Sequence, residues 1–421
     1  MKHKEKRIQE NKGITLIALV VTIVVLIILA TVSINAVLGQ NGIIGKAKQA
    51  KESYEKSVKA EDTAMQELLN EMAQYNGGEP TGNIDPETGW DLDKVNKVTS
   101  EDKVIVPVPK GYTASTVTGE KSVSSGFVIK EGNDGSVTSG INEFVWVPVS
   151  NISDIYDEAN NAGQLWDFGT SSSPKNPAVK QTYPTTKNSG YREPDVVTKA
   201  SEGSDSTSGT QCDAVSTNLQ QAGMSSTATA STFKTQLQNE FKEMIKSVKT
   251  YGGFYIGRYE TGNLSQIKAV VQKNNSDINN QIWYTMYKVC KTIKANDNVA
   301  TSMLWGCQWD ATMRWMQTSS NSEVANFPTN SEGKGNYSGT QGDTNAPIPT
   351  GSNSSYSVNN IYDMAGNVFD WTIEAYITNN RVLRGGYYSG TASFNPASFR
   401  ISYGPADSGS HCGCRSTLYV K

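Results

Sequence analysis

The sequence is poor in histidine and cysteine. Its 421 residues include only two histidines, His3 and His411, so Ser-His-Asp or Cys-His catalysis, or a histidine-rich metal site, would have to depend on His411. Five cysteines are an odd number, so at least one is free or pairs between chains, and a disulfide scaffold is not expected. The formal net charge of −3 provides no electrostatic signature of nucleic-acid binding, and we expect no nucleic-acid partner.

A second absence concerns the C-terminal segment. Residues 387–420 contain no Lys, Glu, Gln, Met or Trp, although all five types occur elsewhere in the chain. Aromatic residues stand there among Gly, Ser and Pro, with neither the alternation of a long strand nor the spacing of a helix. Secondary-structure periodicity therefore does not explain the composition of this segment.

The remaining composition suits an extracellular protein rich in strands and loops. Charged residues make up only 19% of the chain, while Gly, Ser, Thr and Asn are abundant. The length allows two or three structural units. We expect a linker over residues 76–100 and a domain over residues 101–421, with a surface insertion at about 169–230.

Four segments of this domain have clear patterns. Residues 144–149 and 252–262 read as strands, the second bounded by glycines. A helix is predicted from Ser231 or Thr232, as its N-terminal cap, to Gly252. A second helix is predicted at residues 307–318, with the large residues of one face in the core. The expected buried faces consist of Phe233, Leu237, Phe241, Ile245 and Val248 in the first helix, and Trp309, Met313 and Met316 in the second.

The N-terminus has the pattern of a membrane anchor. A basic stretch, residues 1–13, precedes an uncharged apolar run, residues 14–38, which exceeds the roughly 20 residues that a helix needs to cross a bilayer. An amphipathic pattern then continues to about residue 75. One interpretation is a plain anchor whose basic leader stays in the cytoplasm.

The junction "KGITLIALVV" also resembles the processing site of type IV prepilins. This resemblance implies a leader over residues 1–13, cleavage between Gly13 and Ile14, and a pilin-like helix over residues 14–75 with pilus subunits as possible partners. Ala18 departs from the pattern, because type IV pilins usually carry Glu there, and this puts filament assembly in doubt. On either interpretation we expect the cell membrane or a pilus as location, with the C-terminal domain outside the cell.

The C-terminal half resembles the formylglycine-generating enzyme family. The residues that carry the resemblance are "YDMAGNVFDWT" at 362–372, "RVLRGG" at 381–386 and "GCR" at 413–415, with "FYIGRYETG" as a weaker early match. The resemblance covers about residues 144–421 and implies a variant of the C-type lectin fold. We therefore predict an α+β fold class, a long N-terminal pilin-like helix followed by a C-type-lectin-like domain. The predicted scaffold residues are Trp371, Arg384, Gly385, Gly386, Arg400, Gly413 and Arg415.

The enzymatic chemistry of that family is not expected here. Its oxygen-dependent members use a pair of cysteines just after the "RGG" motif, and residues 387–399 contain none. Cys412 and Cys414 come later, with side chains on one face of a predicted strand. Together with His411 they could hold a soft metal, but a fourth ligand is missing nearby. We predict no enzyme activity, no cofactor and no metal site.

The C-type lectin fold also carries the target proteins of diversity-generating retroelements. That resemblance implies a last stretch rewritten by copying an RNA template in which adenines are misread. Asparagine codons then change into many residue types, but never into Lys, Glu, Gln, Met or Trp, the five types absent from residues 387–420. The predicted variable region is 387–415. Its predicted ligand-binding positions are Tyr387, Ser389, Gly390, Phe394, Phe399, Ile401, Ser402, Tyr403, Gly404, Ser410, His411 and Cys412.

The favoured hypothesis is a surface-displayed, hypervariable ligand-binding protein of the adhesin or receptor type. Tyr gives large and stiff contact area, while Ser and Gly give adaptable hydrogen bonding. The expected partner is a protein, a glycan or a phage surface. Two alternatives remain: an oxidase of the formylglycine-generating type, and an invariant minor pilin or adhesin.

Overall fold

The computed structural model describes residues 21, 23–25, 83–138, 140–182, 191–192, 216–262, 269–277, 279–293, 296–318, 324–339, 345–376 and 380–421. The chain divides into two units, Met1–Thr81 and Gly82–Lys421. The predicted leader, its cleavage site at Gly13 and Ile14, and nearly all of the predicted helix over 14–75 lie outside the described residues. Within the part that is described, no helix is both long enough and apolar enough to cross a membrane.

The predicted α+β class with a long N-terminal helix is wrong. The described residues form a mostly β structure with nineteen strands and four α-helices, and none of these helices is a long N-terminal one. Most of the strands are only two to five residues long, and four of these, at 162–163, 253–257, 412–414 and 416–420, are buried along their whole length. Short, fully buried strands show no alternation of apolar and polar residues, so the sequence pattern underestimates the amount of β structure.

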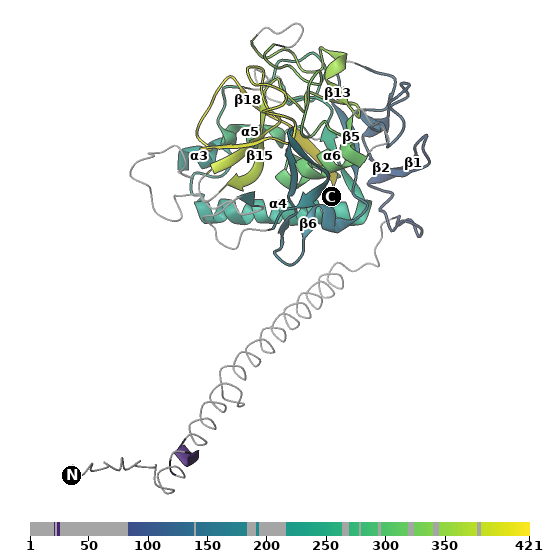
Figure 1. Cartoon of the computed structure of the whole chain (residues 1–421). Coiled ribbons are helices and arrows are strands. Elements are labelled where there is room, and N and C mark those ends of the chain that lie inside the picture. The colour runs from purple at the N-terminus through teal and green to yellow at the C-terminus, as the bar shows by residue number, and fades with distance from the viewer. Residues whose placement is uncertain are drawn as a thin grey trace, which may run out of the picture. The chain divides into compact units, whose positions relative to one another are not determined.

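The larger sheet has six strands, and every neighbouring pair is antiparallel. Its order is β12 (Val299–Met303), β19 (Ser416–Val420), β11 (Gly253–Gly257), β5 (Glu143–Pro148), β4 (Val128–Glu131) and β3 (Tyr112–Ala114). The last strand of the chain thus lies inside the sheet, and all its residues are buried. This strand, which leads to the chain end marked C in Figure 1, is therefore part of the core.

The second sheet carries the predicted variable region. Its path is β10 (Tyr191–Arg192), β15 (Phe369–Tyr376), β16 (Asn380–Arg384) and β17 (Arg400–Tyr403), and β18 (Cys412–Cys414) pairs parallel to β15. Four two-stranded sheets complete the β structure: β1 (Val95–Thr99) with β2 (Ile105–Pro109), β6 (Tyr156–Asp157) with β7 (Ala162–Gly163), β8 (Trp166–Thr170) with β9 (Ser173–Lys180), and β13 (Ser357–Val358) with β14 (Ile361–Tyr362).

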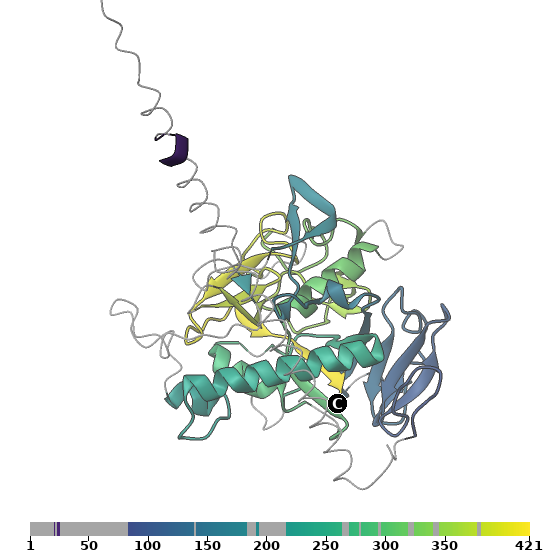
Figure 2. The same cartoon turned by 90° about the horizontal axis from the view of Figure 1, so that it is seen from below.

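The helix predicted to end at Gly252 is present as α4 (Ala230–Tyr251). Its N-cap is Thr229, not Ser231 or Thr232, and Thr232 completes a capping box by returning a side-chain bond to the Thr229 backbone. Gly252 ends the helix in the left-handed conformation. The five predicted face residues are buried, and α4 lies alongside β11 and β19 (Figure 2).

The second predicted helix is α6 (Gly306–Thr318), and its Trp309, Met313 and Met316 are fully buried. It contacts β5 of the larger sheet and β15 of the second sheet, so it ties the two sheets together. The predicted strands at 144–149 and 252–262 are present as β5 and the shorter β11. A third helix, α5 (Trp283–Cys290), packs against β12 and β18.

Two segments expected to be irregular contain regular elements. The predicted linker, 76–100, includes β1, which pairs with β2 over its whole length. The predicted insertion, 169–230, includes most of the β8–β9 hairpin, β10 and the short helix α3 (Ser216–Gln221). Ala178 of β9 and Leu219 of α3 are buried in the core.

Candidate ligand-binding site

Four aromatic rings from separate segments meet at one end of β15. The ring of Phe369, the first residue of β15, is stacked on Tyr387 at a centroid distance of 4.8 Å. The rings of Phe399 and His411 lie 6.1 Å and 6.3 Å from the same centre. Because 387, 399 and 411 belong to the turns before β17 and before β18, the second sheet brings three predicted ligand-binding residues onto one phenylalanine. We call these four residues the aromatic cluster.

Further rings extend the cluster toward the surface. Tyr403 lies 6.2 Å from His411, and Tyr388 lies 5.7 Å from Tyr387. Phe394 lies 6.4 Å from Phe399, and 76% of its side chain is exposed. Apolar surface of this size costs free energy in water, and burial against a partner would recover it.

The predicted ligand-binding positions fall into three groups by exposure. The exposed ones are Ser389, Phe394 and Ser410, and the half-buried ones are Tyr387, Phe399, Ile401, Ser402, Tyr403 and His411. Gly390, Gly404 and Cys412 are buried. A side chain added at Gly390 would meet Asn395 Oδ1 at 2.7 Å. These last three residues cannot present a side chain to a partner in this structure, unlike the other nine.

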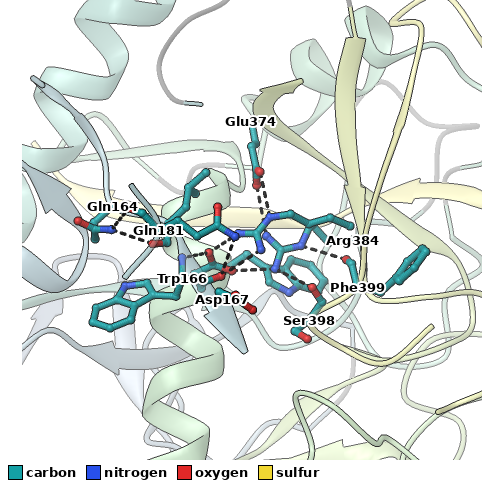
Figure 3. Close-up of polar contacts among 12 residues, drawn as sticks. Gln164, Trp166, Asp167, Gln181, Glu374, Arg384, Ser398 and Phe399 are labelled. Carbon is teal, nitrogen blue, oxygen red and sulfur yellow. Dashed lines mark hydrogen bonds and ion pairs between the residues drawn. The ribbon is translucent and has the colours of Figure 1, made fainter. Parts of the chain in front are cut away.

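A buried ionic network holds the turn that carries the cluster. Arg384 donates to Glu374 Oε2 at 3.3 Å (Figure 3). It also donates to Asp310 Oδ1 at 2.7 Å, and all three side chains are fully buried. Arg400 binds the other oxygen of each carboxylate, at 3.0 Å for Glu374. Burial raises the pKa of Glu374, and the two guanidinium groups act against that rise. Four charges from α6, β15, β16 and β17 therefore compensate one another inside the domain.

The network also binds backbone groups of the neighbouring loops. Arg384 donates to the carbonyl oxygens of Ser398 and Phe399 at 3.2 Å and 3.1 Å (Figure 3). Arg400 donates to the carbonyl of Trp166, whose N–H donates to Asp310 at 2.7 Å. The backbone at position 399 is thus held by Arg384, whichever residue type occupies this position.

The other predicted scaffold residues are buried as well. Arg415 donates to Asp370 at 3.2 Å and to the carbonyl of Gly257 at 3.0 Å, so it joins β15 to the larger sheet. Trp371 is fully buried and Gly413 lies in the middle of β18. Gly385 and Gly386 have φ angles of 89° and 79°. A Cβ at Gly386 would meet the carbonyl oxygen of Asn395 at 2.2 Å, so only glycine fits this turn.

Sequence reasoning missed three residues of this region: Asp310, Glu374 and Phe369. Glu374 lies in the strand sequence "FDWTIEAY", and Asp310 lies beside Trp309 in a helix whose predicted core face consists of Trp309, Met313 and Met316. Charged residues within such apolar segments are a usable signal, because a buried carboxylate needs a buried partner. Phe369 offered no comparable signal, since its role depends on residues of two later connections, the one between β16 and β17 and the one between β17 and β18.

A second polar cluster lies beneath the "AGN" motif. Asn367 donates to Glu260 Oε2 at 2.6 Å and to Asp277 Oδ2 at 2.9 Å, and its own carbonyl accepts from the Tyr388 N–H at 2.9 Å. Burial raises the pKa of Asp277 to about 8, and burial together with Asp277 raises the pKa of Glu260. The two acids are therefore not both ionised at neutral pH.

The metal site considered for His411, Cys412 and Cys414 gains no support. No group of three or more His, Cys, Asp or Glu residues in the described ranges is arranged to hold a metal ion. Burial raises the pKa of Cys412 to about 12, so this thiol stays protonated at neutral pH. Cys414 contacts Cys290 instead. The expected absence of a cofactor remains a prediction.

Comparisons with known proteins support some of the predictions made from the sequence. Residues 305–418 match the family described as sulfatase-modifying factor enzyme 1-like domain, which confirms the resemblance to formylglycine-generating enzymes for this stretch. No curated protein matches the chain. Nothing in the comparisons supports the pilin-like interpretation of the N-terminus.

Several solved structures are similar at low identity. PvdO from Pseudomonas aeruginosa is 16% identical, with 40% of this chain and 82% of that chain covered and a TM-score of 0.29. Treponema denticola variable protein 1 is 14% identical, with 68% of this chain and 98% of that chain covered and a TM-score of 0.26. The P3c variant of the major tropism determinant is 12% identical, with 79% of this chain and 88% of that chain covered and a TM-score of 0.32. TM-scores below 0.5 do not establish a shared architecture or function.

Proposed function

We propose that this chain is a surface-displayed ligand-binding protein whose C-terminal site is diversified by a retroelement. The observation that carries the proposal is the aromatic cluster: Tyr387, Phe399 and His411 surround Phe369 and remain partly exposed. The residues expected to stay constant, such as Arg384 and Arg415, are fully buried. Side chains that vary at the surface above a buried frame can change without loss of the fold.

Recognition at this site would not require turnover. The aromatic rings give contact area at a small cost in side-chain entropy, while Ser389, Ser402 and Ser410 supply hydrogen bonds that adapt to the partner. Phe394, which is 76% exposed, would be an anchor that loses much water on binding. We therefore propose a binding protein of the adhesin or receptor type rather than an enzyme.

The proposed setting is the cell surface. The N-terminal segment would anchor the chain in the membrane, with pilus subunits as possible neighbours, and the domain over residues 101–421 would be exposed outside the cell. The partner would be a protein, a glycan or a phage surface. These assignments follow from the N-terminal sequence pattern and from the composition of the variable region.

Deep sequencing of roughly the last forty codons of this gene, across a population of the source organism and its relatives, tests the proposal. We expect differences to accumulate at the exposed and half-buried positions and only where the template has adenine. The codons of the buried frame, such as Arg384 and Arg415, should stay constant. A single invariant sequence would contradict diversification and would leave a dedicated adhesin or minor pilin, which should co-purify with filaments.

The oxidase alternative is favoured by one observation, the match of residues 305–418 to a family named for an enzyme. An oxidase would lose thiol-dependent oxidation when Cys412 and Cys414 are replaced. We expect no such activity in the unmodified protein either, because Cys414 is fully buried and the Cys412 thiol stays protonated at neutral pH. Cysteine-dependent oxygen consumption would reverse the assignment.

A further inference from the structure

Two buried cysteines lie in direct contact although they are far apart in sequence. Cys290 is the last residue of α5, and Cys414 is the last residue of β18. Their sulfur atoms are 3.6 Å apart, and neither residue has any exposed surface. The pair is separated by 124 residues, and it joins a helix to the strand that ends the predicted variable region.

We propose that Cys290 and Cys414 form a structural disulfide when the chain folds in an oxidising environment. A disulfide requires a sulfur–sulfur distance of about 2.05 Å, so the two sulfurs would have to approach by roughly 1.5 Å in total. Shared between two side chains, this movement is small enough to leave α5 and β18 in place. The proposal concerns the frame of the domain and does not require the site to vary.

The chemistry balances with an external disulfide as oxidant, such as oxidised glutathione or a disulfide-exchange protein. One cysteine thiolate attacks the oxidant and forms a mixed disulfide, with release of one thiol. The second thiolate then attacks the protein sulfur of the mixed disulfide and releases the other thiol. The two cysteines lose two protons and two electrons, and the oxidant is reduced to two thiols.

The surroundings indicate when this step takes place. Contact with Cys290, together with burial, raises the pKa of Cys414, so the reactive thiolate is scarce once α5 has packed against β18. The oxidant also cannot reach a fully buried sulfur. The bond would therefore form during folding and would persist afterwards because the same burial protects it from reductants.

The bond would stabilise the base of the candidate site. β18 begins at Cys412, directly after His411 of the aromatic cluster, and it pairs with β15 at Phe369. A covalent link from Cys414 to α5 would hold this strand in place while the residues before it change. Closing a loop of this length removes much conformational entropy from the unfolded chain. The folded state is stabilised by comparison, so the effect should be easy to measure.

Refolding of the full chain with oxidised and reduced glutathione tests the proposal without reference to its cellular location. After free thiols are alkylated, digestion without reductant and mass spectrometry should find a peptide that links Cys290 to Cys414. Protein refolded in the presence of a reductant, so that the bond cannot form, should melt about 5–10 °C lower than protein refolded with the glutathione couple. Alkylation of all five cysteines, or a link between a different pair, would overturn the proposal even if no variant folds.

A pair of variants gives the matched control. Cys290→Ser should make the melting temperature insensitive to reductant. Cys307→Ser replaces another fully buried cysteine on a helix, and it should keep the sensitivity. A reductant effect that persists in Cys290→Ser would assign the stabilisation to another bond and refute this one.

Discussion

Arg384 and Arg400 lie directly opposite each other on β16 and β17, and both bind the same two carboxylates, Asp310 and Glu374. Two cations at this separation would repel each other, and the pair persists because each carboxylate bridges both guanidinium groups. The segment between the two arginines, residues 385–399, is thereby fixed at both ends. The candidate site is a loop supported by an ionic frame, and this arrangement leads to testable predictions.

Arg384→Met should destabilise the domain by about 3–5 kcal/mol, because it leaves Asp310 and Glu374 buried with one partner instead of two. Urea unfolding followed by tryptophan fluorescence measures this free energy. Lys121→Met is the control, since Lys121 and Glu101 form an ion pair that is largely exposed, and its loss should cost less than about 1 kcal/mol. Equal effects of the two variants would show that the network contributes nothing special.

Gly386→Ala should be much more destabilising than Gly333→Ala. Both glycines have φ angles above 70°, but a Cβ at Gly386 would clash with the Asn395 carbonyl at 2.2 Å, whereas a Cβ at Gly333 meets nothing within 4 Å. The backbone strain is thus shared, and the clash is specific to the first variant. We expect a difference of more than about 2 kcal/mol in thermal unfolding. Similar melting temperatures would mean that the turn after β16 can move.

Exposed and buried positions of the predicted variable region should respond differently to substitution. Phe394→Asn should change the free energy of unfolding by less than about 0.5 kcal/mol, because most of the side chain is in water. Cys412→Tyr should cost about 1–3 kcal/mol, because Cys412 is buried in β18 and a larger side chain overpacks the core. Natural variation at 412 should accordingly be restricted to small residues. A fully stable Cys412→Tyr protein would contradict this restriction.

The stability of the domain should decrease with pH through Asp277. Burial raises its folded-state pKa from 3.8 to about 8, so between these values the native state holds a proton that the unfolded state has lost. Stability is therefore greatest below about pH 4 for this group and falls toward pH 8, by up to about 1.4 kcal/mol per pH unit. Asp277→Asn should flatten this dependence in unfolding experiments from pH 5 to pH 8.

Asp134→Asn is the control for that experiment. Asp134 is exposed, and hydrogen bonds from Ser136 lower its pKa, so its replacement should leave the slope between pH 5 and pH 8 unchanged. A wild-type slope that Asp277→Asn does not reduce would place the proton on another group, first of all Glu260, which shares the Asn367 side chain.

The sequence predicted α4 and α6 because each has a long, regular apolar face, which is a local property of the chain. It also predicted that Arg384, Arg415 and the two glycines after β16 belong to the scaffold, from two short motifs, "RVLRGG" and "GCR". It underestimated the β structure, since short buried strands such as β18 and β19 have no alternating pattern. Strand pairing depends on contacts between distant segments, which a local pattern does not contain.

By itself, the sequence therefore determined the unusual composition of residues 387–420 and the short motifs from which the scaffold residues are predicted. Only the tertiary structure decided which of those residues can reach a partner: Phe394 is exposed, whereas Gly390, Gly404 and Cys412 are buried. It alone brought Cys290 to Cys414 and placed residues of two connections, those before β17 and before β18, around Phe369. The physical reason is that exposure and contact depend on how distant segments pack, while composition and motif spacing are properties of the chain alone.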